Sequence, residues 1–152
     1  MWQVKINQTT DSGRKAQYRG YIDNIINGRR PTHRQSELEI EYFYEQVGGT
    51  AQRSFKGSRQ VPMGTRGSTR PDIVVSGMLE VKNYKIQNAN NLIRELVRQI
   101  TMRREGPYDL RQQGIILDFR GQVVPEADLL DLLNRVSNAT SVPIENIQIV
   151  TW

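Results

Sequence analysis

The segment RPDIVVSGMLEVK, residues 70–82, decides the fold of this chain. Two short apolar runs, 73–75 and 78–81, flank a Ser-Gly pair, and the second is interrupted by Glu80; short apolar runs around such a pair predict a β-hairpin. We expect a three-residue loop, 75–77, with Gly77 in the left-handed conformation, because a two-residue loop would demand a positive φ from the serine. The hairpin that follows pairs Val74 with Met78.

The same register puts Asp72 opposite Glu80, and the alternation of side chains along a strand adds Lys82 to their face. The other face is entirely apolar, formed by Ile73, Val75, Leu79 and Val81. A slip of one residue would bury the charges, so this pattern specifies the register. We therefore expect one face of the hairpin to pack in the core and the other to gather two carboxylates and an ammonium.

This charged group predicts a metal site. Two ionised carboxylates about 5 Å apart repel each other, and a divalent cation removes that penalty. Mg²⁺ or Mn²⁺ suits ligation by oxygen, to which the backbone carbonyl of Val81 could contribute, and Zn²⁺ is an alternative. The metal would polarise a phosphoryl oxygen and acidify a bound water, while Lys82 would orient that water or offset charge on the phosphate. A purely structural alternative is a surface ion pair of Glu80 with Lys82 beside a solvated Asp72.

The composition excludes other chemistries. The 152 residues suffice for one domain, and the absence of cysteine excludes disulfides, zinc-thiolate sites and thiol nucleophiles. With His33 as the only histidine, a catalytic histidine pair is excluded as well. No apolar run is long enough to span a membrane, so we expect no membrane contact by this domain. The net charge of +5 favours nucleic acid or another polyanion as the partner.

The periodicity of the whole chain predicts an α/β fold in which helices flank a mixed β-sheet. The expected elements are a helix over 36–47, a strand over 50–56, a loop over 57–71, two short strands over 72–84, a helix over 90–104, a strand over 114–119, a helix over 127–136 and a strand over 144–152. Residues 1–34 are expected to be a polar lead-in with one short helix that ends at Gly28, and 35–152 to form the functional domain.

Pro71-Asp72 followed by Glu80-Val81-Lys82 resembles the signature of the PD-(D/E)XK nuclease superfamily. The resemblance implies a restriction-endonuclease-like α-β-β-β-α-β core and a metal-dependent endonuclease. Family members usually take a further acidic ligand from the first helix, for which the chain offers Glu37, Glu39 and Glu41. Glu37 is preferred because it shares the inward face of that helix, and Glu41 is the second choice.

The resemblance also suggests a role for a glutamine on the helix after the lysine. Several branches of the family have such a glutamine, and Gln99 borders the apolar stripe of the helix over 90–104. A tyrosine often follows it four residues later, but here that position is Arg103. This departure leaves the role of Gln99 open.

Three segments are closer still to the C-terminal nuclease toxin domains of bacterial polymorphic toxins, including contact-dependent inhibition and Rhs-type systems. They read GTRGSTRPD over 64–72, EVKNY over 80–84 and LDFRGQ over 117–122. The resemblance spans about residues 36–152. It implies export within a larger toxin, delivery to the cytoplasm of a target cell, and neutralisation by a cognate, acidic immunity protein.

The nature of the substrate stays open at this point. DNA is the favoured substrate, and cleavage of tRNA or other RNA by the same fold is the alternative. A housekeeping resolvase or repair nuclease, or a non-catalytic nucleic-acid-binding module, are further alternatives.

Basic and hydroxyl side chains near the hairpin are candidate contacts to nucleic acid. In the loop before it, Thr65, Arg66, Ser68 and Arg70 suit phosphate contacts, although the loop could also be a plain connector. The helix over 90–104 carries several arginines that are each typical of a solvated face and together could follow a phosphate backbone: Arg94, Arg98, Arg103 and Arg104. Arg98 is the one that we select as a contact. Asp118 is expected to cap Arg120 at a strand end.

Overall fold

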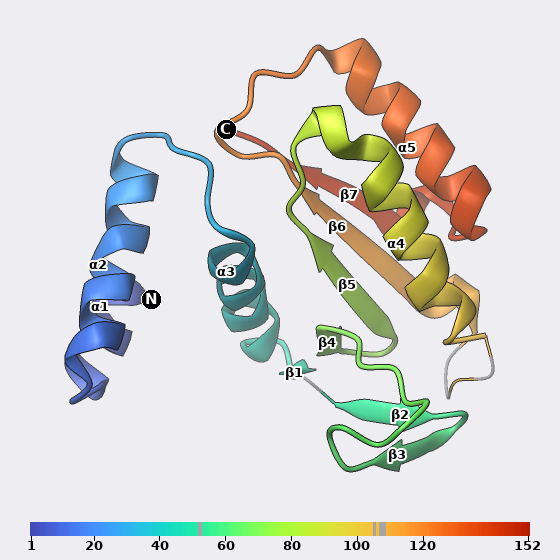
Figure 1. The fold of residues 1–152 in the computed structure, drawn as a ribbon, viewed down its shortest axis with the longest axis horizontal. Coiled ribbons are helices and arrows are strands. Elements are labelled where there is room, and N and C mark those ends of the chain that lie inside the picture. The colour runs from blue at the N-terminus through green and yellow to red at the C-terminus, as the bar shows by residue number, and fades with distance from the viewer. Residues whose placement is uncertain (52, 105, 107–108) are drawn as a thin grey trace.

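A five-stranded mixed sheet in the order β1-β4-β5-β6-β7 organises the chain, with helices on both of its faces (Figure 1). This computed structural model describes residues 1–51, 53–104, 106 and 109–152. The sheet strands are β1 (Thr50–Ala51), β4 (Ile73–Val74), β5 (Met78–Lys82), β6 (Gln113–Asp118) and β7 (Ile147–Val150), and a separate hairpin joins β2 (Ser54–Lys56) to β3 (Arg59–Val61). The helices are α1 (Trp2–Gln8), α2 (Ser12–Ile26), α3 (His33–Glu45), α4 (Ala89–Thr101) and α5 (Glu126–Thr140). The predicted α/β class is therefore confirmed.

The strand directions follow from the connections. β1, β4 and β5 are antiparallel neighbours, whereas β5, β6 and β7 are parallel. Parallel strands need a long crossover, and α4 and α5 supply the two crossovers. Both helices pack on the same face of the sheet, where their apolar residues meet those of β6 and β7 in one core. The main contributors to this core are Leu92, Leu96, Ile100, Ile115, Leu117, Leu132 and Val136.

The other face of the sheet is covered by α3. Its Ile40 and Tyr44 pack against a second cluster of buried residues, formed by Ile73, Leu79, Val81 and Ile116. Three of these four are residues of the hairpin face that the alternation predicted to be apolar. The prediction that this face packs in the core is confirmed, and α3 is the element that it packs against.

The hairpin has the predicted register but a different turn. Val74 pairs with Met78, as expected, and the Val75 N–H donates to the Gly77 carbonyl at 3.0 Å. The left-handed residue, however, is Ser76, with a φ of +43°, so the assignment of that conformation to Gly77 was wrong. Gly77 is needed for another reason: a Cβ there would lie 2.1 Å from the carbonyl oxygen of Gln112.

Residues 1–34 form more structure than the single short helix that we expected. α1 precedes α2, and the predicted helix is the second half of α2. Trp2 and Tyr21 are buried, and the Trp2 Nε1–H donates to Glu39 Oε1 on α3 at 2.8 Å. Aromatic packing and this hydrogen bond thus attach the first two helices to α3.

Several element ends differ from the periodicity estimates. α3 begins three residues earlier than predicted because Thr32 caps it, accepting a hydrogen bond from the Gln35 N–H at 3.1 Å. The last strand is limited to Ile147–Val150, and α5 extends to Thr140. Within the described residues, no helix combines the length and apolarity needed to cross a membrane.

Candidate active site

Asp72 lies directly before β4 and faces the backbone of β5. Its Oδ2 accepts a hydrogen bond from the Val81 N–H at 2.7 Å. Burial and, second, the negative charge of Glu80 raise the pKa of Asp72, whereas the Val81 hydrogen bond and Lys82 lower it, and the balance is a pKa of about 6. Asp72 and Glu80 are therefore close enough to repel each other when both are ionised, as the hairpin register predicts.

Glu80 is the most enclosed charged group of this cluster, with 1% of the residue exposed. Its Oε1 contacts the Lys82 ammonium, and its Oε2 accepts from Arg103 Nη2 at 2.6 Å. The ion pair of Glu80 with Lys82 that the structural alternative predicted is therefore present, but both side chains are buried instead of lying at the surface. The charged face of the hairpin lies under α4 instead of in solvent.

Arg103 is the residue of this cluster that the sequence analysis placed incorrectly. It was counted with the solvated arginines of the long helix, but only 2% of it is exposed. Besides Glu80, it donates from Nε to Thr69 Oγ1 at 3.0 Å and from Nη1 to Gln113 Oε1 at 3.3 Å. The guanidinium thus joins the end of α4 to the loop before β4 and to the strands β5 and β6.

A sequence signal for the burial of Arg103 existed. Leu92, Leu96 and Ile100 form the buried stripe of α4, and Arg103 follows at the next position of that stripe. Arg94, Arg98 and Arg104 leave the stripe and are exposed, as predicted. A charged residue on a buried stripe requires a buried partner, and Glu80 is that partner.

The three glutamates of α3 have different surroundings. Glu37 accepts from His33 Nε2 and from Arg34 Nη1, each at 3.0 Å. The hydrogen bond from His33 is the largest influence that lowers the pKa of Glu37. Its negative charge also raises the pKa of Asp72, so Glu37 is within electrostatic range of the hairpin site.

Glu39 and Glu41 are less closely tied to the site. Glu39 accepts hydrogen bonds from Trp2, from Gln35 and, at 2.6 Å, from Arg120. Arg120 in turn forms an ion pair with Asp118 at 2.6 Å, and its backbone N–H donates to Asp118 Oδ1 at 3.1 Å, so the predicted capping of Arg120 by Asp118 is confirmed. Glu41 is partly buried, and this burial raises its pKa.

Asn83 positions α3 relative to β5, and the sequence analysis did not assign it a role. Its Nδ2 donates to Ser36 Oγ at 2.7 Å and to the Pro31 carbonyl at 3.0 Å. Because Asn83 directly follows Lys82, these hydrogen bonds hold the first turn of α3, and with it Glu37, at the end of β5 that carries the charged residues.

The other predicted contacts gather only in part. Ser68, Arg70, Arg98 and Gln99 line one pocket of about 120 Å³, whose remaining walls are Thr69, Met102 and Arg103. Thr65 and Arg66 do not line it. The Thr65 hydroxyl donates to the Pro62 carbonyl at 2.7 Å within the turn, and Arg66 is exposed.

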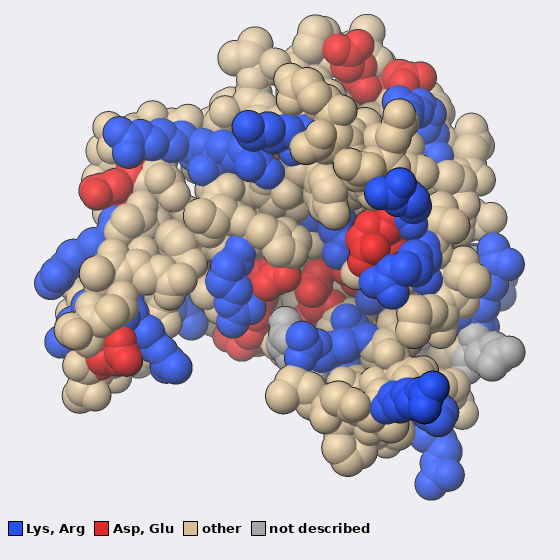
Figure 2. Space-filling model, viewed as in Figure 1, with Lys and Arg blue, Asp and Glu red and all other residues tan. Residues whose placement is uncertain are grey.

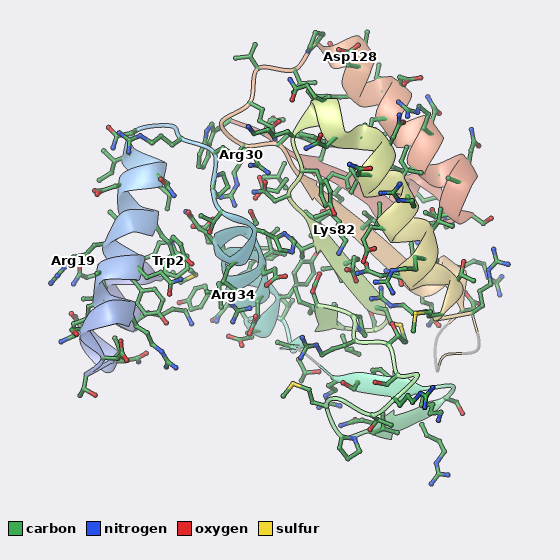
Figure 3. The ribbon with its side chains drawn as sticks, in the orientation of Figure 1. Trp2, Arg19, Arg30, Arg34, Lys82 and Asp128 are labelled. Carbon is green, nitrogen blue, oxygen red and sulfur yellow. The ribbon has the colours of Figure 1, made fainter. Side chains whose placement is uncertain are left out.

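The charges of this region have a simple arrangement. Figure 2 shows acidic side chains in the middle of the face between α3 and α4, with lysine and arginine side chains around them. In Figure 3 the labelled Lys82 projects from β5 between the same two helices. An acidic centre can attract a cation, and a basic surround can contact phosphates.

The donor set of the centre fits a hard divalent cation in its chemistry. Asp72 and Glu80 supply carboxylate oxygens, and the raised pKa of Asp72 marks a repulsion that a cation would relieve. Each carboxylate oxygen has more than one lone pair, so the contacts of Glu80 with Lys82 and Arg103 leave sites for a metal. Over the described ranges, no three histidine, aspartate or glutamate side chains form a group that could hold a metal ion. Ligation by Glu37, Glu41 or the Val81 carbonyl stays a prediction.

Comparison with known proteins supplies no relative for this chain. No family model matches it, and neither a curated protein nor a solved structure is similar to it.

Proposed function

We propose that this chain is a metal-dependent endonuclease that hydrolyses phosphodiester bonds of nucleic acid. The observation that supports the proposal is the convergence of Asp72, Glu80 and Lys82 where the chain enters β4 and along β5, with the pKa of Asp72 raised to about 6 by burial and, next, by the negative charge of Glu80. A divalent cation would relieve both the burial of the carboxylate charge and the repulsion, and perturbed carboxylates of this kind are typical of functional sites.

The residues divide into distinct roles. Asp72 and Glu80 would hold Mg²⁺ or Mn²⁺, with Zn²⁺ as an alternative, together with the Val81 carbonyl and a glutamate of α3, Glu37 before Glu41. When bound, the metal would polarise the phosphate and make a bound water more acidic. Lys82 contacts Glu80 Oε1 and would offset the negative charge that builds up on the phosphoryl oxygens.

Other residues would support these groups. Arg103 holds Glu80 Oε2 in a fixed position through a buried ion pair. The basic and hydroxyl residues around the site would contact the phosphates on either side of the cleaved bond. They are Ser68, Arg70 and Arg98, together with Thr65 and Arg66, which come earlier in the same loop as Ser68.

The biological setting is proposed from the resemblance of the sequence. The domain would be the C-terminal part of an exported toxin, would act in the cytoplasm of a target cell, and would be neutralised by a cognate immunity protein. An acidic immunity protein suits the net charge of +5 and the basic surround of the site. DNA is the first substrate to test, and tRNA or other RNA is the alternative.

The proposal is tested by incubating the purified domain with plasmid DNA and with total tRNA, each with Mg²⁺, Mn²⁺, Zn²⁺ or EDTA. We expect cleavage of one substrate with a metal and none with EDTA. Absence of cleavage of both substrates with every metal would contradict the proposal. Tight binding without cleavage, unchanged by EDTA, would identify a non-catalytic nucleic-acid-binding module instead.

A further inference from the structure

Gln99 has a buried acceptor without a partner. Its Oε1 is shielded from solvent and meets no hydrogen-bond donor within the part of the chain that the structure describes. The orientation of the amide is determined by its other end, because Nε2 donates to Glu95 Oε1 at 2.9 Å. Turning the amide over would place its oxygen against a carboxylate, so Oε1 stays the atom that faces away from Glu95.

Gln99 lines the pocket between α4 and the loop over 68–70 together with two arginines suited to an anion, Arg70 and Arg98, of which Arg98 is also paired with Glu95 at 2.6 Å. Arg70 and Arg98 are exposed at this pocket, and guanidinium groups bind phosphate in a two-pronged geometry. The pocket measures about 120 Å³. Pockets that enclose a whole drug-sized ligand begin at about 300 Å³. The space is therefore suited to part of a nucleotide backbone.

The donor that Gln99 lacks distinguishes the two kinds of backbone. Along its backbone, a DNA strand presents phosphate and sugar oxygens that only accept hydrogen bonds. An RNA strand adds one 2′-hydroxyl per nucleotide, which can donate as well as accept. A small pocket that combines arginines with a buried acceptor matches the RNA backbone, because the arginines can bind the phosphate and the acceptor can bind the 2′-hydroxyl.

We propose that this pocket binds a phosphodiester group together with the neighbouring 2′-hydroxyl of an RNA substrate, and that Gln99 Oε1 accepts the hydrogen bond of that hydroxyl. This inference rests on the proposed nuclease function and narrows its substrate class to RNA. The pocket is next to the candidate centre, because Arg103 lines it and also contacts Glu80 at 2.6 Å. The nucleotide that it binds is therefore a close neighbour of the cleaved bond.

The inference is tested by binding in EDTA, so that cleavage does not enter the result. Three fluorescent single strands of one sequence are compared by anisotropy: RNA, its 2′-deoxy form with uracil retained, and its 2′-O-methyl form, which keeps the 2′-oxygen but has a methyl group in place of the hydroxyl hydrogen. We expect the intact chain to bind the RNA about five-fold more tightly than the other two strands, which corresponds to one hydrogen bond of about 1 kcal/mol.

Two variants and a control complete the experiment. Gln99→Ala, and Gln99→Met as a variant of similar volume, are expected to bind the three strands equally, with the affinity for the deoxy strand unchanged. Gln87→Ala, which changes an exposed glutamine outside the pocket, is expected to keep the five-fold preference. Arg98→Ala is expected to weaken binding of all three strands by a similar factor, because it removes a phosphate contact.

Equal binding of the three strands by the unchanged protein would overturn the inference, and so would a preference that persists in both Gln99 variants. Neither result would contradict nuclease activity on DNA. Failure to bind any strand, even at low salt, would contradict the nucleic-acid substrate itself, so the two failures are distinguishable.

Discussion

Arg103 and Glu80 form a buried ion pair, with 2.6 Å between Arg103 Nη2 and Glu80 Oε2 and almost no solvent exposure of either side chain. The pair joins the turn after α4 to the strand that carries the candidate catalytic residues. Its geometry therefore links the stability of the fold to the position of Glu80.

Replacement of Arg103 by methionine is expected to destabilise the protein by about 3 kcal/mol. Breaking a buried pair leaves an uncompensated charge, which costs about 3–5 kcal/mol, and the remaining contact of Glu80 with Lys82 puts the loss at the lower end. Urea unfolding measures the loss. Arg104→Met, at an exposed position, is the matched control and should change the stability little. Equal effects of the two substitutions would show that the buried pair does not stabilise the fold.

Asp72 is expected to make the metal-free protein less stable as the pH rises. Its pKa of about 6 in the folded state lies above the ordinary value of 3.8, so the folded state holds the proton more tightly than the unfolded state. The free energy of unfolding should therefore fall between about pH 4 and about pH 6, by up to about 3 kcal/mol, and level off above that range.

Urea unfolding in EDTA over this pH range tests the effect of Asp72. Asp72→Asn removes the titrating group and should flatten the decline, whereas Asp131→Asn, at an exposed position on α5, should leave it unchanged. A decline of equal size in wild type and Asp72→Asn would assign the pH dependence to other groups.

Loss of any of the three central groups is expected to abolish cleavage by protein that is still folded, and removal of Glu80 or Lys82 is also expected to lower the free energy of unfolding because it breaks a buried ion pair. The substitutions are Asp72→Ala, Glu80→Ala and Lys82→Ala, and the measurements are substrate cleavage and circular dichroism. Lys85→Ala changes an exposed lysine three residues beyond Lys82 and should keep full activity. Full activity of a folded Asp72, Glu80 or Lys82 variant would refute the proposed mechanism.

Glu37 and Glu39 are expected to differ in what they support. Glu37→Gln should weaken Mn²⁺ binding, measured by calorimetry, because Glu37 is the glutamate of α3 that acts electrostatically on Asp72. Glu39→Gln should instead lower the free energy of unfolding by about 1.5–3 kcal/mol, because it removes one of the two charged partners of Arg120. Weaker Mn²⁺ binding by Glu39→Gln but not by Glu37→Gln would identify Glu39 as the metal ligand instead.

Gly77→Ala is expected to destabilise the hairpin by about 1–3 kcal/mol, through the close approach of the added Cβ to the Gln112 carbonyl. Ser76→Gly, in contrast, should be neutral or slightly stabilising, because Ser76 holds the left-handed conformation that glycine tolerates. Thermal unfolding of the two variants compares them. If Gly77→Ala is as stable as the wild type, residue 77 and the Gln112 carbonyl are not in close contact.

The sequence by itself determined the α/β class, the pairing of Val74 with Met78 and the separation of an apolar hairpin face from a charged one. These features follow from the alternation of side chains between the two faces of a strand, which depends only on residues close together in the sequence. Only one pairing register of the hairpin keeps the charged residues out of the apolar core. It also indicated the capping of Arg120 by Asp118, because the two residues are neighbours on the chain.

Tertiary structure alone decided that Arg103 joins Lys82 in neutralising Glu80, which helix covers the charged face, and that Gln99 shares a pocket with Arg70. Arg103 is 23 residues from Glu80 along the chain, so no local pattern connects the two side chains. Its guanidinium is buried because α4 packs over the parallel strands and brings the end of the helix to β5. The energetic reason is that a buried carboxylate requires buried partners, and only the packed fold determines which side chains can reach it.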